Sequence, residues 1–233
     1  MNISGMLLRR LSQAGIIACF LSMMCSAPLA MGGERAAVQT ESKSRPTSTP
    51  YTGDLAHFDY PERDKKLQIN RVMDLLGIKA GSNVADIGAG GGWFTVRAAS
   101  RVGTSGRVFA EDINPEAIDY VRKRAQREHL GNVQEILGQA DDPMLPANSI
   151  DAVLLLKTYH EIAQPVILLR KLRKSLRSGA HLGIIDRNGN GADHGVQKDV
   201  VIKEAAEAGY KLIGTYDFVK PDQVDYFLVF QPE

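Results

Sequence analysis

The chain has little cysteine and little charge imbalance. Its only two cysteines, Cys19 and Cys25, both lie within the first thirty of 233 residues. If that N-terminal segment is removed, no thiol is left, which excludes disulfide bonds, a cysteine nucleophile and a cysteine-based zinc site. The 28 basic and 27 acidic residues leave a formal net charge of +1. No basic surplus therefore indicates a nucleic-acid partner.

The sequence also lacks a metal-binding motif. His160 and Glu161 are followed by Gln164, where a zinc protease motif would need a second histidine. The other histidines show no ligand spacing: His57, His129, His181 and His194. We therefore predict no metal site.

Residues 1–32 have the pattern of an export signal. Two arginines precede an apolar run over residues 14–26, which is too short to span a bilayer comfortably, and small residues around Ala30 offer a cleavage site. We expect a periplasmic or secreted protein with no membrane span after signal removal. Two alternatives stay open: an uncleaved anchor, or a true start at Met31 that leaves the protein in the cytoplasm.

Beyond the signal, composition divides the chain into two parts. Residues 33–54 are rich in Ser, Thr, Pro, Glu and Lys without apolar periodicity, which predicts a disordered linker. Residues 55–233 alternate between helical and strand patterns and are long enough for one domain with a substantial core.

The domain is predicted to be α/β. Strands are expected at residues 83–87, 107–112, 133–137, 150–156, 181–185, 212–218 and 225–230. Helices are expected at 62–76, 93–102, from 115 onward, 165–176 and 196–208. Strands separated by helices predict a mostly parallel sheet covered on both faces. The last two strands have no helix between them, so they must be antiparallel.

Residues 86–92 connect the first strand to a helix and contain four glycines. Glycines let the backbone approach a ligand closely, and a helix start attracts an anion. The loop alone fits a dinucleotide or a methyl donor. Gly88 and Gly90 match the dinucleotide fingerprint, but its third glycine position is Trp93, which counts against NAD. Glu111 and Asp112 end the next strand, where a carboxylate can accept hydrogen bonds from a ribose.

The order and spacing of these motifs resemble class I S-adenosylmethionine-dependent methyltransferases over residues 55–230. The matching segments are 84–98, 112–115, 151–161 and 176–180. Within that superfamily the chain is similar to a bacterial group that often carries a signal-like N-terminus, through Arg63-Asp64, Tyr159-His160 and the aromatic residues of 226–230. The resemblance implies a Rossmann-like fold with a seven-stranded sheet, and methyl transfer to an acceptor that we expect to be a small molecule.

The resemblance also implies the residues that hold the donor. Asp86, Gly88, Ala89 and Gly90 would cradle its methionine end. Asp112 would hold the ribose, with Ile113 against the adenine. The adenine would be flanked by Gln139, Ala140 and Asp141. The chain departs from the family at Gln139, where Asp is common, so either Gln139 or Asp141 would contact the adenine amino group.

The acceptor is expected at the end of the fourth strand. If the acceptor must lose a proton, His160 is the natural general base, with Tyr159 beside it. The alternative is that both residues only wall the pocket, or that His160 caps a turn. Two other functions stay open: an NAD-dependent oxidoreductase, and an exported binding protein that keeps the fold without catalysis.

Overall fold

The computed structural model describes residues 44–47, 51, 53–190, 193–219 and 224–233. The predicted export signal lies outside these residues and stays a prediction. Within the part that is described, no helix combines the length and the apolar character needed to span a membrane.

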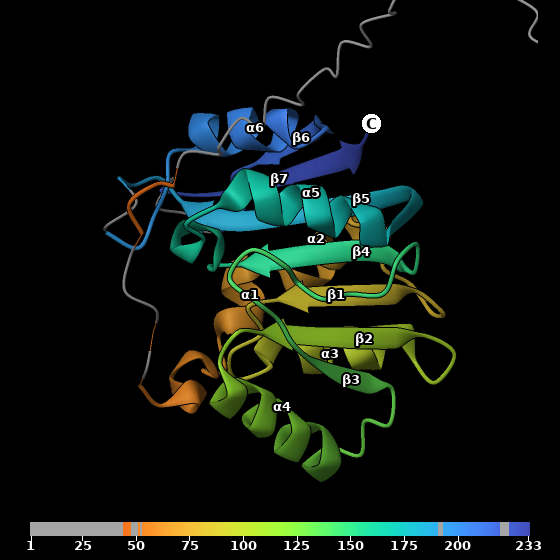
Figure 1. Ribbon diagram of the computed structural model, residues 1–233. Coiled ribbons are helices and arrows are strands. Elements are labelled where there is room, and N and C mark those ends of the chain that lie inside the picture. The colour runs from red at the N-terminus through yellow and green to blue at the C-terminus, as the bar shows by residue number, and fades with distance from the viewer. Residues whose placement is uncertain (1–43, 48–50, 52, 191–192, 220–223) are drawn as a thin grey trace, which may run out of the picture. The chain divides into compact units, whose positions relative to one another are not determined.

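Seven strands form one sheet in the order β3-β2-β1-β4-β5-β7-β6 (Figure 1). The strands are β1 Asn83–Ile87, β2 Arg107–Asp112, β3 Val133–Leu137, β4 Ile150–Leu156, β5 Leu176–Arg187, β6 Tyr210–Tyr216 and β7 Asp225–Pro232. The pairs among β1 to β5 are parallel, whereas β7 runs antiparallel to both β5 and β6. The predicted sheet, mostly parallel with an antiparallel last strand, is confirmed.

Helices cover both faces of the sheet. They are α1 Arg63–Leu67, α2 Ile69–Leu75, α3 Trp93–Val102, α4 Pro115–Arg127, α5 Pro165–Ser175 and α6 Lys198–Glu207, with short 3-10 helices η1 Leu55–Phe58 and η2 Tyr159–Glu161. One core cluster joins α2 and α3 to the sheet, and another joins α5 and α6 to it. The apolar stripe of each helix therefore packs against strands that are buried from both sides.

One predicted helix is wrong. We expect a single helix over residues 62–76, but it breaks at Gln68, which adopts a left-handed conformation with φ +47° between α1 and α2. Leu67 and Ile69 are both buried, and a continuous helix cannot turn residues two apart toward the same core. The side-chain amide of Gln68 donates a hydrogen bond to the carbonyl of Phe218 at 3.1 Å.

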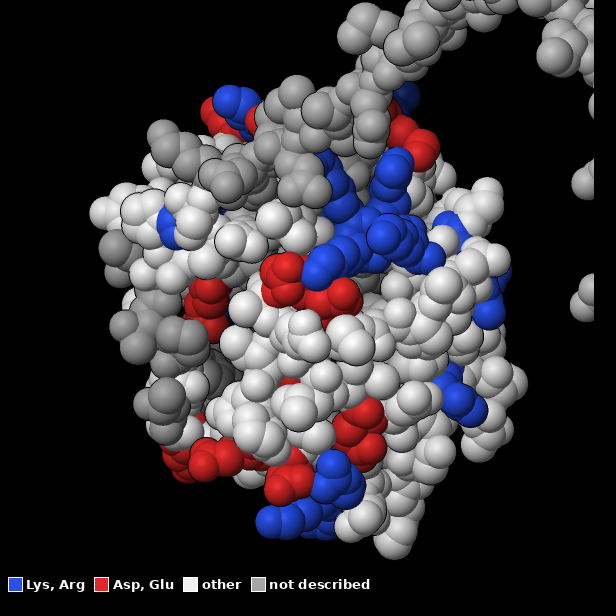
Figure 2. Space-filling view, in the orientation of Figure 1, with Lys and Arg blue, Asp and Glu red and all other residues white. Residues whose placement is uncertain are grey.

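Basic side chains gather over α5 on the face shown in Figure 2, and this helix carries four basic residues in its second half. Acidic residues lie beside them: Lys171 Nζ is 2.9 Å from Asp141 and 3.4 Å from Asp142. The charges at this surface therefore partly neutralise one another, in keeping with the near-neutral chain.

Candidate active site

A cavity of about 750 Å³ opens at the carboxyl ends of β1, β2 and β4. In the sheet, β2 and β3 lie on one side of β1, and β4 and β5 lie on the other side. The direction in which successive strands are added therefore reverses between β1 and β4. In open α/β sheets this reversal leaves a crevice where ligands bind. The loops that follow these three strands line the cavity, as predicted.

The glycine loop forms one wall of the cavity. Gly88 and Gly90 both have a positive φ, +70° and +51°, which explains why glycine occupies these positions. A Cβ atom added to Gly88 would collide with the side chain of Thr158, whereas one added to Gly90 would meet nothing within 4 Å. The loop thus packs tightly against the segment after β4 and leaves its backbone open to the cavity at Gly90.

The carboxylate of Asp112 fixes the glycine loop to the end of β2. It accepts hydrogen bonds from the backbone N–H of Gly90 and of Asn114, both at 2.9 Å. Ile113 beside it is 53% exposed although it is apolar, and it lines the cavity. An exposed apolar side chain next to a carboxylate is suited to a ligand that has both an aromatic ring and hydroxyl groups.

Two of the three residues predicted to flank the adenine reach the cavity. Gln139 and Ala140 line it, and Gln139 is held by backbone hydrogen bonds with Asp142. Asp141 is not among the lining residues, and its carboxylate pairs with Lys171 instead. Of the two residues considered for an adenine contact, the structure therefore places Gln139 at the cavity.

Two buried acids at the cavity have raised pKa values. Burial raises the pKa of Glu111 to about 8, and the neighbouring Asp112 carboxylate adds to the rise. Burial also raises the pKa of Asp86 to about 6, against the effect of a hydrogen bond from the hydroxyl of Thr95 at 2.6 Å. Clustered acids with raised pKa values are typical of functional sites.

The candidate residues of the segment after β4 divide into two groups. Thr158 and Glu161 line the cavity, whereas Tyr159 and His160 are buried behind it. The hydroxyl of Tyr159 donates to Glu204 at 2.7 Å. The ring of His160 is hydrogen bonded to Asp186 instead of a cavity group. The catalytic roles of Tyr159 and His160 stay predictions, and Glu161 is the acidic group of this segment that borders the cavity.

The cavity has a further wall that sequence reasoning missed. Tyr51, Leu55 and Phe58 line it from the segment before α1, part of which was expected to be a linker. The guanidinium groups of Arg63 and Arg97 lie 4.3 and 4.1 Å from the centre of the Trp93 ring. Aromatic residues just before the first helix were the available signal, but nothing in their spacing indicated that they fold over the glycine loop.

A family described as a methyltransferase domain matches residues 78–213, more than half of the chain. The chain belongs to this methyltransferase family. The match runs from just before β1 into β6 and so includes the glycine loop, Asp112 and Glu161. The prediction that S-adenosylmethionine is the methyl donor agrees with this family assignment.

The curated relatives match over part of their length. The chain is 29% identical over 115 residues to the ubiquinone/menaquinone biosynthesis C-methyltransferase UbiE of Hahella chejuensis, covering 49% of this chain and 46% of the relative. It is 37% identical over 84 residues to the aklanonic acid methyltransferase DauC of Streptomyces sp. strain C5, covering 36% of this chain and 38% of the relative. The matched region thus spans less than half of these relatives.

Solved structures show the same fold. A SAM-dependent methyltransferase from Aquifex aeolicus superposes with a TM-score of 0.70 at 23% identity, covering 77% of this chain and 97% of that one. The [4+2]-cyclase SpnF superposes with a TM-score of 0.62 at 13% identity, covering 82% and 86%. Because the second protein is called a cyclase, the fold alone does not fix the reaction.

The cavity fits S-adenosylmethionine. This donor carries a sulfonium and an ammonium cation against one carboxylate, so its net charge is positive. Asp86 and Asp112 place carboxylates along the cavity, and opposite charges attract strongly where water is excluded. The open side of Gly90 leaves room for a ligand against the backbone.

Proposed function

We propose that this protein transfers a methyl group from S-adenosylmethionine to a small-molecule acceptor that binds in the same cavity. The observation that carries the proposal is that one cavity of about 750 Å³ is bordered by the glycine loop, Asp112 and Glu161. Its volume lies within the range of small-ligand sites. The donor, when bound, supplies a methyl group on a positively charged sulfur.

At the donor end, residues that line the cavity would hold the different parts of the ligand. Gly88, Ala89 and Gly90 would bind the methionine end through the backbone, with Asp86 beneath them. Asp112 would accept hydrogen bonds from the ribose hydroxyls, which requires its carboxylate to serve the ligand as well as the loop. The adenine would lie between Ile113 on one side and Gln139 and Ala140 on the other.

At the acceptor end, the chain's main task is positioning. Holding two reactants at the correct distance and angle supplies a large part of the rate in displacement reactions. Thr158 and Glu161 border this end, while Tyr51 and Phe58 cover it with aromatic surface. We propose that Tyr159 and His160, buried behind the wall, hold η2 in place so that Glu161 faces the cavity.

Two observations favour a small molecule as the acceptor. The names of the relatives from Hahella chejuensis and Streptomyces mention ubiquinone, menaquinone and aklanonic acid, which are small molecules. The near-neutral net charge provides no electrostatic attraction for nucleic acid.

The donor assignment can be tested through the chain's only tryptophan. Trp93 lines the cavity, so S-adenosylmethionine should change its fluorescence on binding. Asp112→Ala should weaken this binding about ten- to a hundred-fold, because a hydrogen bond to a charged group is worth roughly 1.5–3 kcal/mol. Asp119→Ala, which removes an exposed carboxylate from α4, should bind like wild type.

The same titration separates the rival functions. NADH binding without S-adenosylmethionine binding would support an oxidoreductase and overturn the proposal. Equal affinity in wild type and Asp112→Ala would overturn the ribose assignment alone. Donor binding without product across a broad screen of small acceptors would favour a non-catalytic binding protein.

A further inference from the structure

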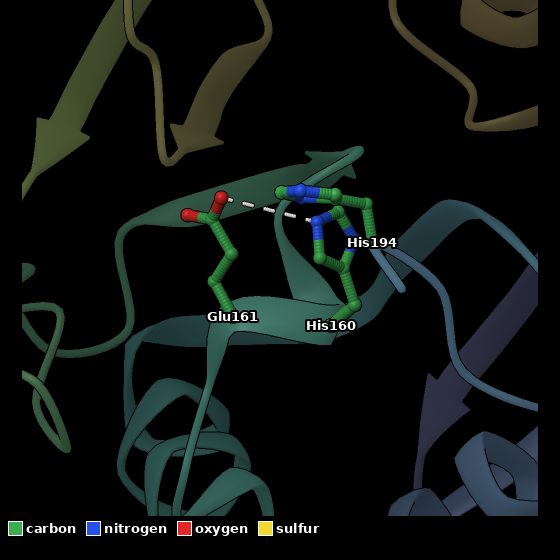
Figure 3. Close-up of side chains that lie close together, drawn as sticks. All are labelled: His160, Glu161 and His194. Carbon is green, nitrogen blue, oxygen red and sulfur yellow. Dashed lines mark ion pairs between the residues drawn. The ribbon is translucent and has the colours of Figure 1, made fainter. Parts of the chain in front are cut away.

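Two histidines and a glutamate from two separate segments of the chain meet beside the cavity. His160 and Glu161 come from η2, after β4, and His194 comes from the loop between β5 and α6. One ligand atom of each residue lies within 4.8 Å of the others (Figure 3). We call these three residues the His–Glu–His cluster. Sequence spacing did not reveal it because 32 residues lie between Glu161 and His194.

The ring of His160 is held in one orientation by Asp186. Nδ1 of His160 is 2.9 and 3.0 Å from the two carboxylate oxygens of Asp186, which is fully buried. The same carboxylate accepts hydrogen bonds from the backbone N–H groups of His160 and Arg187, at 3.0 and 2.9 Å. Because a carboxylate only accepts hydrogen bonds, Nδ1 is the donor to Asp186, and Nε2 is the ring nitrogen on the side away from Asp186.

That nitrogen, Nε2, faces the cluster. Nε2 of His160 lies 3.8 Å from Oε1 of Glu161, and the two histidine rings are 5.7 Å apart between centroids in an edge-to-face arrangement. A distance of 3.8 Å is too long for a hydrogen bond, whose usual range is about 2.7–3.2 Å. Nε2 of His160 and the Glu161 carboxylate therefore lie close together without being hydrogen bonded to each other.

The arrangement matches the way proteins prepare a histidine for a metal. Metal-binding histidines commonly donate their second ring N–H to a carboxylate, which fixes the tautomer and makes the ligand nitrogen more basic. Asp186 performs this task for His160, which is only 4% exposed. Two imidazole nitrogens and one carboxylate are a ligand set that zinc and iron(II) enzymes use.

We propose that the His–Glu–His cluster binds a divalent first-row transition-metal ion through Nε2 of His160, the carboxylate of Glu161 and the imidazole of His194. A tetrahedral ion with bonds of about 2.0–2.1 Å holds its ligand atoms about 3.3 Å apart, so the cluster must contract by roughly 1 Å. His160 is fixed by Asp186, whereas the Glu161 side chain is 24% exposed and His194 lies at the surface. The contraction therefore falls on the two outer ligands.

The position of the cluster suggests what the ion would do. Glu161 lines the cavity, so a bound ion borders it, and three protein ligands leave a coordination position open. An acceptor hydroxyl or enol oxygen would fit that position, where a metal ion lowers the pKa of the oxygen it binds. This acceptor class rests on the proposed function, whereas binding of the ion does not.

The test uses the full chain after removal of any polyhistidine tag and treatment with a chelator. Calorimetric titration with ZnCl₂ or CoCl₂ should show one ion per chain, and Co²⁺ should develop visible absorption. Mg²⁺, which prefers oxygen ligands, should bind far more weakly than Zn²⁺. No binding of Zn²⁺ or Co²⁺, or Mg²⁺ binding as tight as Zn²⁺ binding, would overturn the proposal.

Single substitutions locate the site. His194→Ala and Glu161→Gln should each weaken Zn²⁺ binding at least ten-fold, and both change residues at least partly exposed, so the fold should persist in thermal melts. His57→Ala, which removes an exposed histidine outside the cluster, and Glu116→Gln, which removes another acidic group that lines the cavity, should bind Zn²⁺ like wild type. A His194→Ala variant with wild-type affinity would show that the ion binds elsewhere.

Metal binding and donor binding are measured separately. The metal titration contains no S-adenosylmethionine, and the Trp93 fluorescence titration is repeated on chelator-treated protein. Donor binding without Zn²⁺ binding would overturn the metal site and leave the proposed function standing. Zn²⁺ binding without donor binding would do the reverse.

Discussion

Gly90 is the residue at which the backbone itself meets the cavity. Its φ is +51°, and an added Cβ atom would have open space around it. Gly103, at the end of α3, has a similar φ of +65° and equally open space, but it does not line the cavity. The two glycines thus share a conformational requirement and differ in whether a ligand would lie next to them.

Substitution of these two glycines should separate an effect on the stability of the fold from an effect on donor binding. Gly90→Ala and Gly103→Ala should each lower the free energy of unfolding by about 1 kcal/mol, because alanine disfavours a positive φ. Gly90→Ala alone should weaken S-adenosylmethionine binding, at least ten-fold, because its methyl group projects into the cavity. Urea unfolding and Trp93 fluorescence measure the two effects. Equal loss of affinity in both variants would contradict the assignment of the loop to the donor.

Glu111 is a buried acid whose protonation should be visible in stability. Its pKa in the folded protein is raised from 4.5 to about 8, mainly by burial. Asp112, Asp86 and Asp142 raise the pKa further, and the backbone N–H of Gly88 opposes them at 3.4 Å. Because the folded state holds this proton more tightly than the unfolded state, the stability that Glu111 contributes is present below about pH 4.5 and is lost as the pH rises toward 8.

Glu111→Gln should therefore stabilise the protein in a pH-dependent way. Near pH 4.5 the free energy of unfolding of the variant should be close to that of wild type. As the pH rises to about 8, the free energy of unfolding of the variant should exceed that of wild type increasingly, by as much as a few kcal/mol. Urea unfolding at several pH values gives the difference. Glu116→Gln, which changes an exposed acid on α4, should show no such trend. A constant difference across this range would mean that Glu111 stays ionised in the folded protein.

At the scale of elements, two helices end in the same motif with different residues. After α2, the N–H of Ile78 bonds the carbonyl of Met73 at 2.9 Å, and Gly77 supplies the required φ of +70°. After α4, the N–H of Leu130 bonds the carbonyl of Ala125 at 2.8 Å, but the left-handed residue is His129 with φ +55°. Glycine is the residue that this motif favours.

Exchanging these residues should move stability in opposite directions. His129→Gly should raise the free energy of unfolding by about 0.5–1 kcal/mol, and Gly77→Ala should lower it by about 1 kcal/mol. His129→Ala should give no gain, because it keeps a Cβ atom at positive φ. Thermal and urea unfolding measure the three variants. If His129→Gly destabilised the protein, the contacts of the histidine side chain would have to stabilise the fold by more than the positive φ of His129 destabilises it.

Most elements could be predicted because their sequence signals are local. β1 and β4 are buried apolar runs, and Asn114 caps α4 through a hydrogen bond to the N–H of Glu116, directly before Pro115. The errors arose where tertiary contacts overrode the pattern. Gln68 breaks a regular helical spacing, and β5 begins at Leu176, five residues earlier than expected, because that end of the strand pairs with Ile150 of β4.

At the scale of the whole molecule, the sequence predicted the donor end of the cavity better than the acceptor end. The glycine loop and Asp112 follow adjacent parallel strands, whose ends must meet at one edge of the sheet. The direction of the side chains in η2 could not be predicted from the sequence. In the structure, Glu161 borders the cavity and His160 does not. The contributions of Tyr51 and His194 depend on how distant loops fold back over that edge.

The fold also gathers acids from several strand ends, and this should couple donor binding to protons. With a pKa of about 8, Glu111 is mostly protonated at pH 7, while Asp86, with a pKa of about 6, is mostly ionised. A cationic ligand favours the ionised form of nearby acids and lowers their pKa. Binding of S-adenosylmethionine should therefore release a fraction of a proton and become tighter as the pH rises from about 6 to 8.

Calorimetry in buffers of different ionisation enthalpy counts these protons. Wild type should release protons at pH 7, and Glu111→Gln should release far fewer while still binding the donor, because the group that is mostly protonated at that pH has been replaced. Glu116→Gln should match wild type. Proton uptake on binding would mean that the ligand buries these acids more than its charge stabilises them, and the sulfonium and ammonium groups would then have to lie away from Glu111.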